Sequence, residues 1–444
     1  MPTTKLTKQA LGLIPYLGEF WKTKRMIEKT ERFPRAFLYE LQMGKLKRLL
    51  IYAHKNLPYY KKTLGGDICN LPFVDRQIVN RERLGMVNWI DGGGIFSVGM
   101  EQVATSGSTG MPLTIYYEKG RTNAREWAYI WHMRQYLGYN PWSKCVVLMD
   151  YPVATASEGI FWYKAMMGRW LVMSTYHMSD KNLPKYIEQI KKFKPEFIQC
   201  YTSAAVTLAR FMRDRNVAPF SLKGILCSSE SLFEGQREFI EKVFGCKVHC
   251  HYGHTEKCVL AYECPVSGKY HIFPQYGYTE IIHPSGRECV KGEIGEIVAT
   301  GFNNRAMPLI RYKTQDYAQF GGYGCSCGRN YMVLDKIEGR LQDYIVTKEG
   351  ALVSLGSVVG GIHEQEWAGI KKVQFEQSKE GSITARAVKP VGAKASIVAE
   401  TVTMLLKKRL SDGFNIKVEF VDDIPLTQRG KVKLLVQNLP IKMT

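Results

Sequence analysis

The sequence predicts an α/β protein: a large N-terminal domain with a parallel sheet and a β-rich subdomain, then a small, mobile α+β domain at the C-terminus. Three features lead to this prediction. Residues 185–252 alternate short apolar strands with amphipathic helices, which is typical of a parallel sheet covered by helices. Residues from about 280 to 340 alternate as strands do, and residues 382–425 follow the order strand, helix, strand.

These features set the expected domain limits. The N-terminal domain covers residues 1–340, with a basic helical start at about 1–62 and the β-rich subdomain at about 265–338. Residues 341–444 form the C-terminal domain. The sequence shows no apolar run long enough for a membrane-spanning helix. We also recognise no signal peptide, so a cytoplasmic location is expected.

The start of the chain is strongly basic. Residues 1–62 hold 14 Lys or Arg against 4 Asp or Glu, which accounts for half of the formal net charge of +20. Apolar residues at helical spacing predict a helix over 36–57, and Pro58 ends it. If residues 11–30 are also helical, four apolar side chains share one face: Ile14, Leu17, Phe20 and Trp21. This face could meet an anionic membrane surface or pack on the protein's own core.

A short loop rich in Ser, Thr and Gly follows. Residues 103–117 predict a strand, a loop and a second strand, and the loop reads TSGSTGMP. Gly107 and Gly110 let backbone N–H groups approach an anion, while Ser106, Ser108 and Thr109 add hydroxyl donors. The loop lacks the lysine of the Walker motif. It is therefore either a phosphate cradle or an ordinary turn.

Polar clusters end the three strands predicted between residues 196 and 252. They are Tyr201-Thr202-Ser203, Ser228-Ser229-Glu230, and Tyr252-Gly253-His254-Thr255-Glu256. Ligands of parallel sheets bind beyond the carboxyl ends of the strands. Thr202 or Ser203 is expected to cap the helix that follows. Glu256 could bind Mg²⁺, and Asp316 could accept hydrogen bonds from the two hydroxyls of a ribose.

The eleven cysteines are odd in number and scattered, which favours a reducing compartment over a disulfide framework. Cys325 and Cys327 are separated by one residue, and Cys264 and His271 lie upstream. Three thiolates and one imidazole would make a closed structural Zn²⁺ site. The alternative is four reduced side chains in a loop region. No histidine pairs with a serine and an acid as a hydrolase requires, and His251 and His254 are expected to be structural or pocket-lining.

The order of these motifs resembles the adenylate-forming ligases. More closely, it is similar to the phenylacetate–coenzyme A ligase family, including its branch associated with capsular polysaccharide. The resemblance covers roughly residues 40–440 and rests on KLKRLLIYAHKNLPYY, VATSGSTGMP, S-S-E, Y-G-x-T-E, R-Y-K-T-x-D, ECPVSGKYH with CSCGR, G-R-x-x-D and a C-terminal Gly-Lys.

The resemblance implies a role for each matching residue. It implies that Ser106, Gly107, Ser108, Thr109 and Gly110 hold the phosphates of ATP, and that Ser229, Glu230 and Ser231 lie against the adenine. Tyr252 would stack near the base and Gly253 would line the acyl pocket. Thr255 would contact phosphate and Glu256 would bind Mg²⁺. Asp316 and Arg340 would hold the ribose, and Lys431 would bridge the substrate carboxylate and the α-phosphate.

The resemblance also implies the reaction: a carboxylic acid and ATP give an acyl-adenylate, which then passes to coenzyme A. The alternatives are transfer to an amine in cell-surface polysaccharide synthesis and a non-catalytic nucleotide-binding relative. Three positions depart from the family pattern: Met111, Gln315 and Gln342. No nucleic-acid partner is expected. The sequence contains no recognisable DNA- or RNA-binding module, and a positive net charge alone is not specific for nucleic acid. A homodimer is a further arrangement that the sequence allows.

Overall fold

The computed structural model describes two compact units, residues 1–140 with 251–337 and residues 141–250 with 338–444. The residues described are 3–64, 71–89, 99–104, 113–140, 142–149, 151, 153, 158–232, 235–340, 343–348, 352–355, 370, 372–388, 394–407, 414–425 and 433–440, without the side chains of 3–15, 104, 352 and 354. The predicted division at residue 340 stays a prediction; a unit boundary lies close to it, between residues 337 and 338.

Five helices belong to the first unit. They are α1 (Thr3–Thr30), α2 (Arg35–Asn56), α3 (Pro58–Thr63), α4 (Arg76–Met86) and α5 (Arg121–Gln135). The helix predicted over 36–57 is confirmed as α2, which buries Leu38, Leu46, Leu49 and Ala53. Asp75 caps α4, because its carboxylate accepts a hydrogen bond of 2.8 Å from the Ile78 amide.

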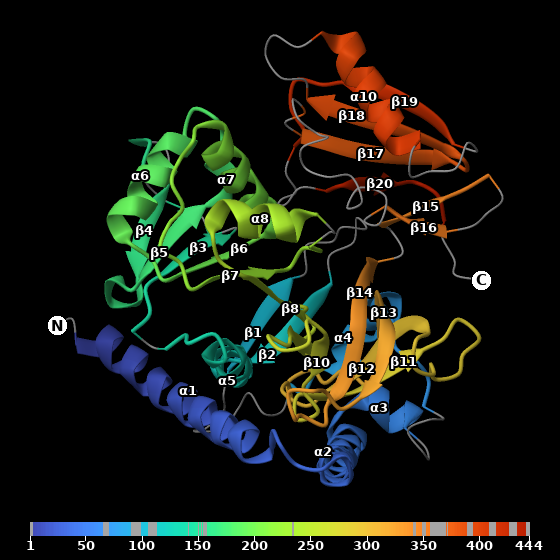
Figure 1. The fold of residues 1–444 in the computed structure, drawn as a ribbon. Coiled ribbons are helices and arrows are strands. Elements are labelled where there is room, and N and C mark those ends of the chain that lie inside the picture. The colour runs from blue at the N-terminus through green and yellow to red at the C-terminus, as the bar shows by residue number, and fades with distance from the viewer. Residues whose placement is uncertain are drawn as a thin grey trace. The chain divides into compact units, whose positions relative to one another are not determined.

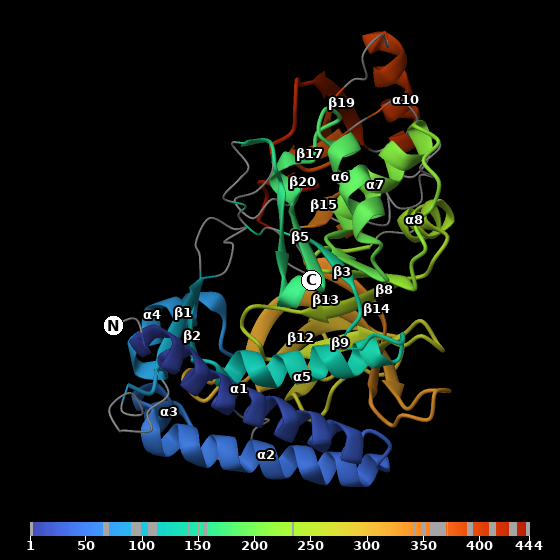
Figure 2. The ribbon, with the colours of Figure 1, turned by 90° about the vertical axis from the view of Figure 1, so that its left-hand side faces the viewer.

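Helix α1 lies beside α5, as Figures 1 and 2 both show. Phe20 of α1 is buried against Ala124 and Ala128 of α5 and meets the Trp131 ring edge-on, with the centroids 5.8 Å apart. Part of the apolar face of α1 therefore packs on the protein's own core. Leu17 and Trp21 stay about half exposed, and the side chain of Ile14 is not among those described.

The strands of the first unit form a hairpin and a larger sheet. The hairpin pairs β1 (Met100–Ala104) with β2 (Thr114–Glu118) antiparallel, as predicted on either side of the glycine loop. The sheet has the strand order β11-β12-β13-β14-β10-β9-β8. Its strands are β8 (Val248–Gly253), β9 (Leu260–Glu263), β10 (Tyr270–Ile272), β11 (Gly277–Ile282), β12 (Ile294–Gly301), β13 (Tyr312–Tyr323) and β14 (Met332–Arg340). The predicted β-rich region is thus confirmed.

The α/β part of the second unit follows the predicted alternation. Its strands are β3 (Cys145–Met149), β4 (Trp162–Ala165), β5 (Trp170–Ser174), β6 (Phe197–Cys200) and β7 (Gly224–Ser228), in the order β7-β6-β3-β5-β4. All neighbours are parallel except β4 and β5. The helices are α6 (Leu183–Phe193), α7 (Thr202–Asp214) and α8 (Gln236–Phe244), with one-turn helices at 166–168 and 175–177. The core includes Tyr186, Ile198, Leu208, Ile225 and Phe244.

The last described part of the chain is the small α+β region that the sequence predicts. The strands β15 (Tyr344–Val346) and β16 (Leu352–Ser354) form a hairpin. A second sheet has the order β19-β18-β17-β20, made of β17 (Lys372–Lys379), β18 (Ser382–Val388), β19 (Asn415–Phe420) and β20 (Leu435–Gln437). Helix α10 (Ala395–Lys407) buries Val402 and Leu406 in a core with Phe375 and Ile383.

The predicted α/β fold class is therefore confirmed, with one correction of detail. Neither Thr202 nor Ser203 caps α7, because the residue before the helix is Tyr201 and no side-chain cap comes from it. The carboxylate of Glu230 takes this role from the next strand end, as described below. Among the described helices, none is both long and apolar enough to cross a membrane.

Candidate active site

The structure describes the expected site residues in two groups. The first unit holds Tyr252, Gly253, Thr255, Glu256 and Asp316, and the second holds Ser229, Glu230, Ser231 and Arg340. The loop residues Ser106, Gly107, Ser108, Thr109 and Gly110, together with Met111, Gln342 and Lys431, lie outside the described residues. Each group is therefore considered within its own unit.

Tyr252 and Asp316 are joined directly. The Tyr252 hydroxyl at the end of β8 donates a hydrogen bond of 2.7 Å to Oδ2 of Asp316 on β13. The Asp316 amide donates to the Thr314 hydroxyl at 3.1 Å, and that hydroxyl donates to the Ile297 carbonyl at 2.7 Å. Asp316 is buried and held on both its backbone and its side chain. Two residues that the sequence separates by 64 positions thus share one polar contact.

Glu256 is buried, and each of its carboxylate oxygens has a partner. The Tyr312 hydroxyl donates to Oε1 at 3.0 Å, and the imidazole Nδ1 of His254 lies 3.1 Å from Oε2. The turn that carries His254 and Glu256 directly follows β8 and is closed by a hydrogen bond of 3.0 Å from the Lys257 amide to the His254 carbonyl. The carboxylate is therefore fixed in direction, which a cation ligand requires.

The hairpin that carries the glycine loop is tied to the same turn. The Tyr117 hydroxyl on β2 donates to the Thr255 carbonyl, and the Lys257 ammonium lies 5.0 Å from the centre of the Tyr117 ring. Lys257 also pairs with Glu126 of α5. Burial lowers the pKa of Lys257 to about 8, although the nearby charge of Glu101 opposes the shift. The strands flanking the loop are thereby anchored beside Thr255 and Glu256.

Gly253 lies close to the neighbouring strand. A Cβ built on it would lie 2.9 Å from Cδ1 of Leu260, on the strand that pairs with β8. The Leu260 side chain would have to shift to admit a larger residue, so glycine keeps the end of β8 open on this side.

Strained backbone gathers in the motifs. Four non-glycine residues with positive φ belong to them: Ser229 at 66°, Lys257 at 53°, Arg311 at 49° and Gln315 at 62°. L-residues avoid this region, because Cβ approaches the following carbonyl. Such strain persists where the surroundings dictate the backbone, which is common at functional sites. Gln315 stands where the family pattern has glycine, and it keeps the glycine-like conformation.

We predict that Gln315→Gly stabilises the protein by about 0.5–1 kcal/mol. The Gln315 side chain is exposed, and its amide donates to Oε1 of Glu296 at 3.1 Å, a bond that glycine retains. Relief of the left-handed strain is partly offset by the larger entropy of the unfolded glycine chain. Urea unfolding measures the change. Gln315→Ala serves as the control, since alanine keeps the strain and should give no gain; equal stabilities of the two variants would contradict the argument.

In the second unit, Glu230 caps helix α7. Its Oε2 accepts a hydrogen bond of 2.8 Å from the Ser203 amide, and its Oε1 accepts one of 3.1 Å from the Ser203 hydroxyl. A carboxylate at a helix N-terminus is favoured by the helix dipole. Near the end of β14, the Arg340 amide donates to Oδ2 of Asp343 at 3.2 Å. A Cβ on Gly339 would lie 3.4 Å from the Ser231 hydroxyl, so the S-S-E and G-R-x-x-D segments approach each other within this unit.

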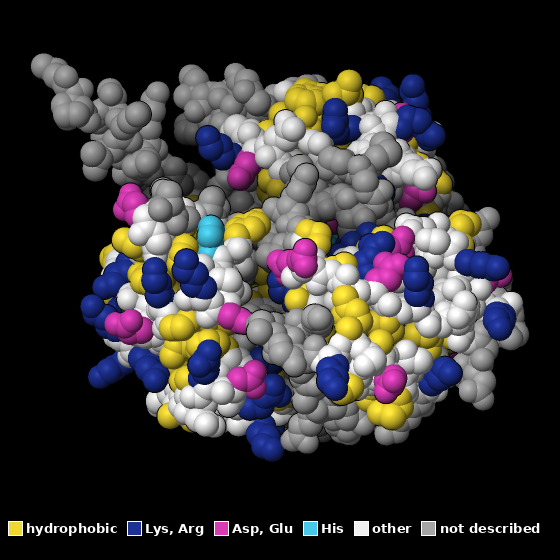
Figure 3. All heavy atoms as spheres, turned by 90° about the horizontal axis from the view of Figure 1, so that it is seen from above, with side chains coloured by type: hydrophobic (Ala, Val, Ile, Leu, Met, Phe, Trp, Pro, Cys, Tyr) yellow, Lys and Arg dark blue, Asp and Glu magenta, His cyan; other side chains and the backbone are white. Residues whose placement is uncertain are grey.

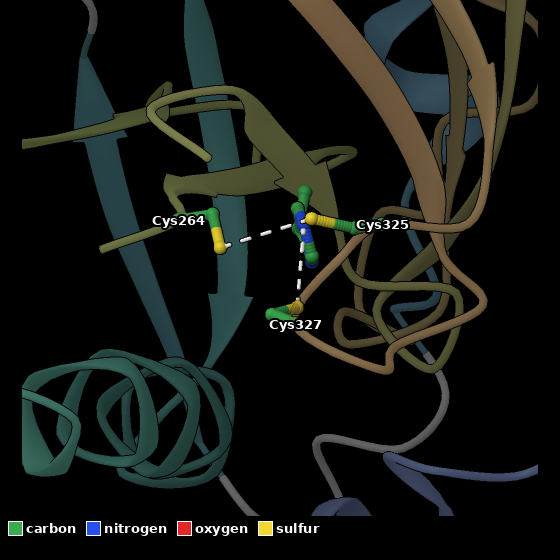
Figure 4. A group of neighbouring side chains, drawn as sticks. Cys264, Cys325 and Cys327 are labelled. Carbon is green, nitrogen blue, oxygen red and sulfur yellow. Dashed lines mark hydrogen bonds between the residues drawn. The ribbon is translucent and has the colours of Figure 1, made fainter. Parts of the chain in front are cut away.

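The expected cysteine–histidine set is brought together. Ligand atoms of Cys264, His271, Cys325 and Cys327 all lie within 4.8 Å of one another. Sγ of Cys264 and Sγ of Cys325 are 4.0 Å apart, and Sγ of Cys327 is 3.9 Å from Nε2 of His271. Figure 4 shows the three labelled sulfur atoms directed toward a common centre. Ligand atoms around a tetrahedral Zn²⁺ with bonds of about 2.3 Å lie about 3.7 Å apart, so the spacing fits zinc.

The charge states of this cluster also suit a metal. Burial and the charge of Arg329 lower the pKa of His271 to about 4, so its imidazole is neutral, the form that binds metals. Burial raises the pKa of the Cys325 thiol, but hydrogen bonds with the Cys327 backbone and the Ser267 hydroxyl outweigh it and bring the pKa to about 7. Cys325 is therefore easily deprotonated.

The cluster is connected to the end of α1. The Arg329 guanidinium lies 3.5 Å from Sγ of Cys327 and 3.3 Å from Oε2 of Glu31. Glu31 also accepts a hydrogen bond of 2.7 Å from the Tyr136 hydroxyl. Burial opposes ionisation of Glu31, but its bonds with His132 and Tyr136 and the charge of Arg329 lower its pKa to about 2. The N-terminal helix thus ends at an ionised carboxylate beside the cysteines.

Three contact residues of the site were given no contact role by the sequence motifs. Tyr312 holds Glu256, His254 lies beside that carboxylate, and Tyr117 holds the turn at Thr255. Only the spacing of His254 and Glu256, two residues apart, hinted that the side chains might meet. Tyr312 and Tyr117 arrive from distant strands, and one sequence contains no signal for such pairing.

Comparison with known proteins gives a consistent result. Residues 104–305 match the AMP-binding enzyme family, and residues 345–438 match the CapK C-terminal domain. The chain is 26% identical to Protein CapK of Staphylococcus aureus over 94% of its own length and 93% of that protein. It is 27% identical to a phenylacetate-coenzyme A ligase of Thermus thermophilus over 72% of this chain and 74% of that one.

Solved structures share the fold. A 2-hydroxyisobutyryl-CoA ligase in the postadenylation state matches with a TM-score of 0.71 at 17% identity, over 92% of this chain and 91% of that one. The amide bond synthetase McbA of Marinactinospora thermotolerans matches with a TM-score of 0.50 at 17% identity, over 74% of this chain and 67% of that one. At this level of identity the likeness concerns the fold alone.

Proposed function

We propose that this chain, which belongs to the phenylacetate–coenzyme A ligase-like family of AMP-forming enzymes, activates a carboxylic acid with ATP and passes the acyl group to coenzyme A. The observation that supports this best is the pair of buried carboxylates, Glu256 and Asp316, each held by a tyrosine hydroxyl. Two oriented carboxylates suit two different parts of a nucleotide: its phosphate-bound cation and its ribose hydroxyls.

The roles that we propose for the described residues follow from their chemistry. Asp316 would accept hydrogen bonds from the ribose, Arg340 would also contact the ribose, and Thr255 would donate to phosphate. Tyr252 would lie at the base, and Ser229, Glu230 and Ser231 would border the adenine. Gly253 would leave space for the acyl group. The loop at Ser106–Gly110 would surround the phosphates and Lys431 would join the carboxylate and the α-phosphate.

The first step is an attack by a substrate carboxylate oxygen on the α-phosphorus of ATP. A new P–O bond forms, the bond to the β-phosphate oxygen breaks, and pyrophosphate leaves, which gives the acyl-adenylate. Both reactants are anions, so positive charge at the site lowers the barrier. In the second step a thiolate attacks the acyl carbon and AMP leaves.

Mg²⁺ is the cation expected with ATP, and the Glu256 carboxylate is the residue that would hold it. The fit is favourable, since this carboxylate is buried, oriented and of the hard oxygen type that Mg²⁺ prefers. When bound, the ion supplies neutralisation of phosphate charge. The protein's own contribution is the fixed direction of Glu256, set by the hydrogen bond from Tyr312.

The test is carboxylate-dependent exchange of labelled pyrophosphate into ATP, run with a panel of aromatic and aliphatic acids. Exchange with at least one acid supports activation. ATP binding without any exchange across the panel would instead favour the non-catalytic alternative. Active acids are then incubated with coenzyme A or with amines, including amino sugars. The amine alternative is thereby tested beside coenzyme A in the same assay.

We also propose that the cluster of Cys264, His271, Cys325 and Cys327 holds a structural Zn²⁺. The prediction is about one zinc per chain in protein purified without chelator, measured by elemental analysis. Cys327→Ser should lose the metal and melt at a lower temperature, because the free energy of metal binding adds to folding. Cys246→Ser, a half-buried cysteine outside the cluster, is the control. Freshly prepared protein free of zinc would disprove the site.

We propose a cytoplasmic location, because eleven scattered cysteines, an odd number, suit a reducing compartment better than a disulfide framework. On the face seen in Figure 3, Lys and Arg side chains lie among Asp and Glu side chains. The homodimer that the sequence allows is tested by light scattering during size-exclusion chromatography.

The exposed side of α1 is a separate proposal for contact with anionic lipid. Leu17 and Trp21 are exposed there beside three basic residues: Lys22, Arg25 and Lys29. Each basic residue near such a surface contributes about 1 kcal/mol at most. Co-sedimentation with phosphatidylserine vesicles should fall with salt and disappear after Trp21→Glu. Equal recovery of variant and parent would rule out the lipid contact, and vesicles of phosphatidylcholine alone serve as the control.

A further inference from the structure

His254 is buried without a hydrogen-bond partner. Its side chain is only 8% exposed, and neither Nδ1 nor Nε2 makes a hydrogen bond to any residue that the structure describes. Buried polar groups normally have partners, because an unpaired one loses its interactions with water and gains nothing in return. The buried His254 imidazole lies beside Glu256, a candidate cation ligand, so a group that binds to the imidazole itself is expected.

The contact between His254 and Glu256 is close but is not a hydrogen bond. Nδ1 lies 3.1 Å from Oε2 of Glu256, yet Nδ1 makes no hydrogen bond to any residue that the structure describes. Neighbouring ligands of an octahedral ion with bonds of about 2.1–2.2 Å lie about 3.0 Å apart. The two atoms are thus spaced like neighbouring ligands of one ion.

The surroundings hold both donors in place. The Tyr312 hydroxyl occupies the other oxygen of Glu256 at 3.0 Å, which leaves Oε2 facing the imidazole. The His254 ring also lies against two tyrosines, with centroids 6.1 Å from Tyr252 and 6.3 Å from Tyr312. The ring is confined by packing and by the closed turn, so the donor pair exists before an ion binds.

We infer that His254 and Glu256 together ligate one divalent cation, and that this mixed nitrogen–oxygen site prefers Mn²⁺ to Mg²⁺. Imidazole nitrogen is a poor ligand for Mg²⁺, which favours oxygen, whereas Mn²⁺ accepts both and binds nitrogen sites more tightly. The inference rests on the proposed function in one respect, namely that the cation binds together with ATP. It adds a ligand and a metal preference to that site.

The experiment uses the full chain with Mn²⁺ and ATP, studied by pulsed electron paramagnetic resonance. Directly bound imidazole nitrogen modulates the Mn²⁺ echo. This signal should be present in the parent protein, absent in His254→Gln, and retained in His283→Gln, which removes a histidine far along the chain. In titrations with ATP present, the dissociation constant for Mn²⁺ should rise about tenfold or more in His254→Gln, while that for Mg²⁺ changes little.

Each result of these measurements either supports the proposed cation ligands or overturns them. Bound Mn²⁺–ATP without a nitrogen signal in the parent protein would overturn the inference and leave the proposed function intact. A nitrogen signal that survives in His254→Gln would come from the adenine and would also overturn it. Absence of ATP binding by calorimetry would remove both the inference and the proposed function. If the variant fails to fold, the parent protein is measured with Mn²⁺ and tripolyphosphate in place of ATP: with no adenine present, a nitrogen signal supports the histidine ligand and its absence overturns the inference.

Discussion

Lys431→Ala is expected to lower acyl-adenylate formation by a factor of about 10³ or more while ATP affinity stays within a few-fold of the parent value. The proposed position of Lys431 lies between two anions, the substrate carboxylate and the α-phosphate. Charge builds up there only as the new P–O bond forms. A residue that acts mainly on the transition state lowers the rate without weakening ground-state binding. Pyrophosphate exchange and calorimetric titration with ATP measure the two quantities separately.

Asp316→Ala provides the contrast. A ribose contact exists in the ground state and the transition state alike, so its loss should weaken ATP binding and lower the rate only at limiting ATP. Tyr252→Phe controls for the hydrogen bond of 2.7 Å that Asp316 accepts within the protein. If Lys431→Ala kept near-normal exchange, the assignment of the catalytic lysine would be wrong. If Asp316→Ala left ATP affinity unchanged, the ribose role would be excluded.

The elements of this fold were predictable where local pattern and burial agree. Helix α2 repeats its apolar residues at helical spacing and ends before Pro58, and the strands β6, β7 and β8 are short apolar runs between amphipathic helices. In these segments one periodicity decides both the secondary structure and the buried face. The order of motifs then identified the carboxylates of the candidate site.

The contacts that fix the site could not be read from the sequence, because they join distant segments. Glu230 was expected at the adenine, yet its carboxylate also caps α7 through Ser203. Tyr312 reaches Glu256 from another strand, and Gln315 keeps a backbone conformation that its residue type disfavours. When contacts with distant segments determine a side chain's role, the neighbouring sequence contains no pattern that predicts it. Departures such as Gln315 mark positions where the surroundings override local preference.

Glu280→Ala is expected to cost about 3–5 kcal/mol of folding free energy, the largest stability effect in the molecule that we predict. Arg311 begins the R-Y-K-T-x-D motif and donates two hydrogen bonds to Glu280, of 3.1 and 2.8 Å, with both side chains buried. It also donates to the Leu71 carbonyl at 2.7 Å and covers the Phe73 ring at 4.2 Å. Removing the carboxylate leaves a guanidinium charge buried without its counter-charge.

The exposed bridge between Arg287 and Glu293 is a matched control. It also has two hydrogen bonds, of 2.7 and 2.6 Å, but lies at the surface, so Glu293→Ala should change stability far less. The double variant Arg311→Met with Glu280→Met should recover part of the loss, since it removes both charges from the interior. Burial raises the pKa of Glu280, although the neighbouring Arg311 acts to lower it.

Loss of the Arg311–Glu280 pair should also disturb the candidate active site, because Tyr312 directly follows Arg311 and holds Glu256. We therefore expect Glu280→Ala to weaken cation and nucleotide binding even at temperatures where the protein remains folded, whereas Glu293→Ala leaves binding unchanged. Denaturant unfolding and calorimetric titration with ATP measure the two effects. If Glu280→Ala lowered the folding free energy by less than about 1 kcal/mol, the Arg311–Glu280 pair would contribute no more than a surface salt bridge, which would contradict the argument from burial.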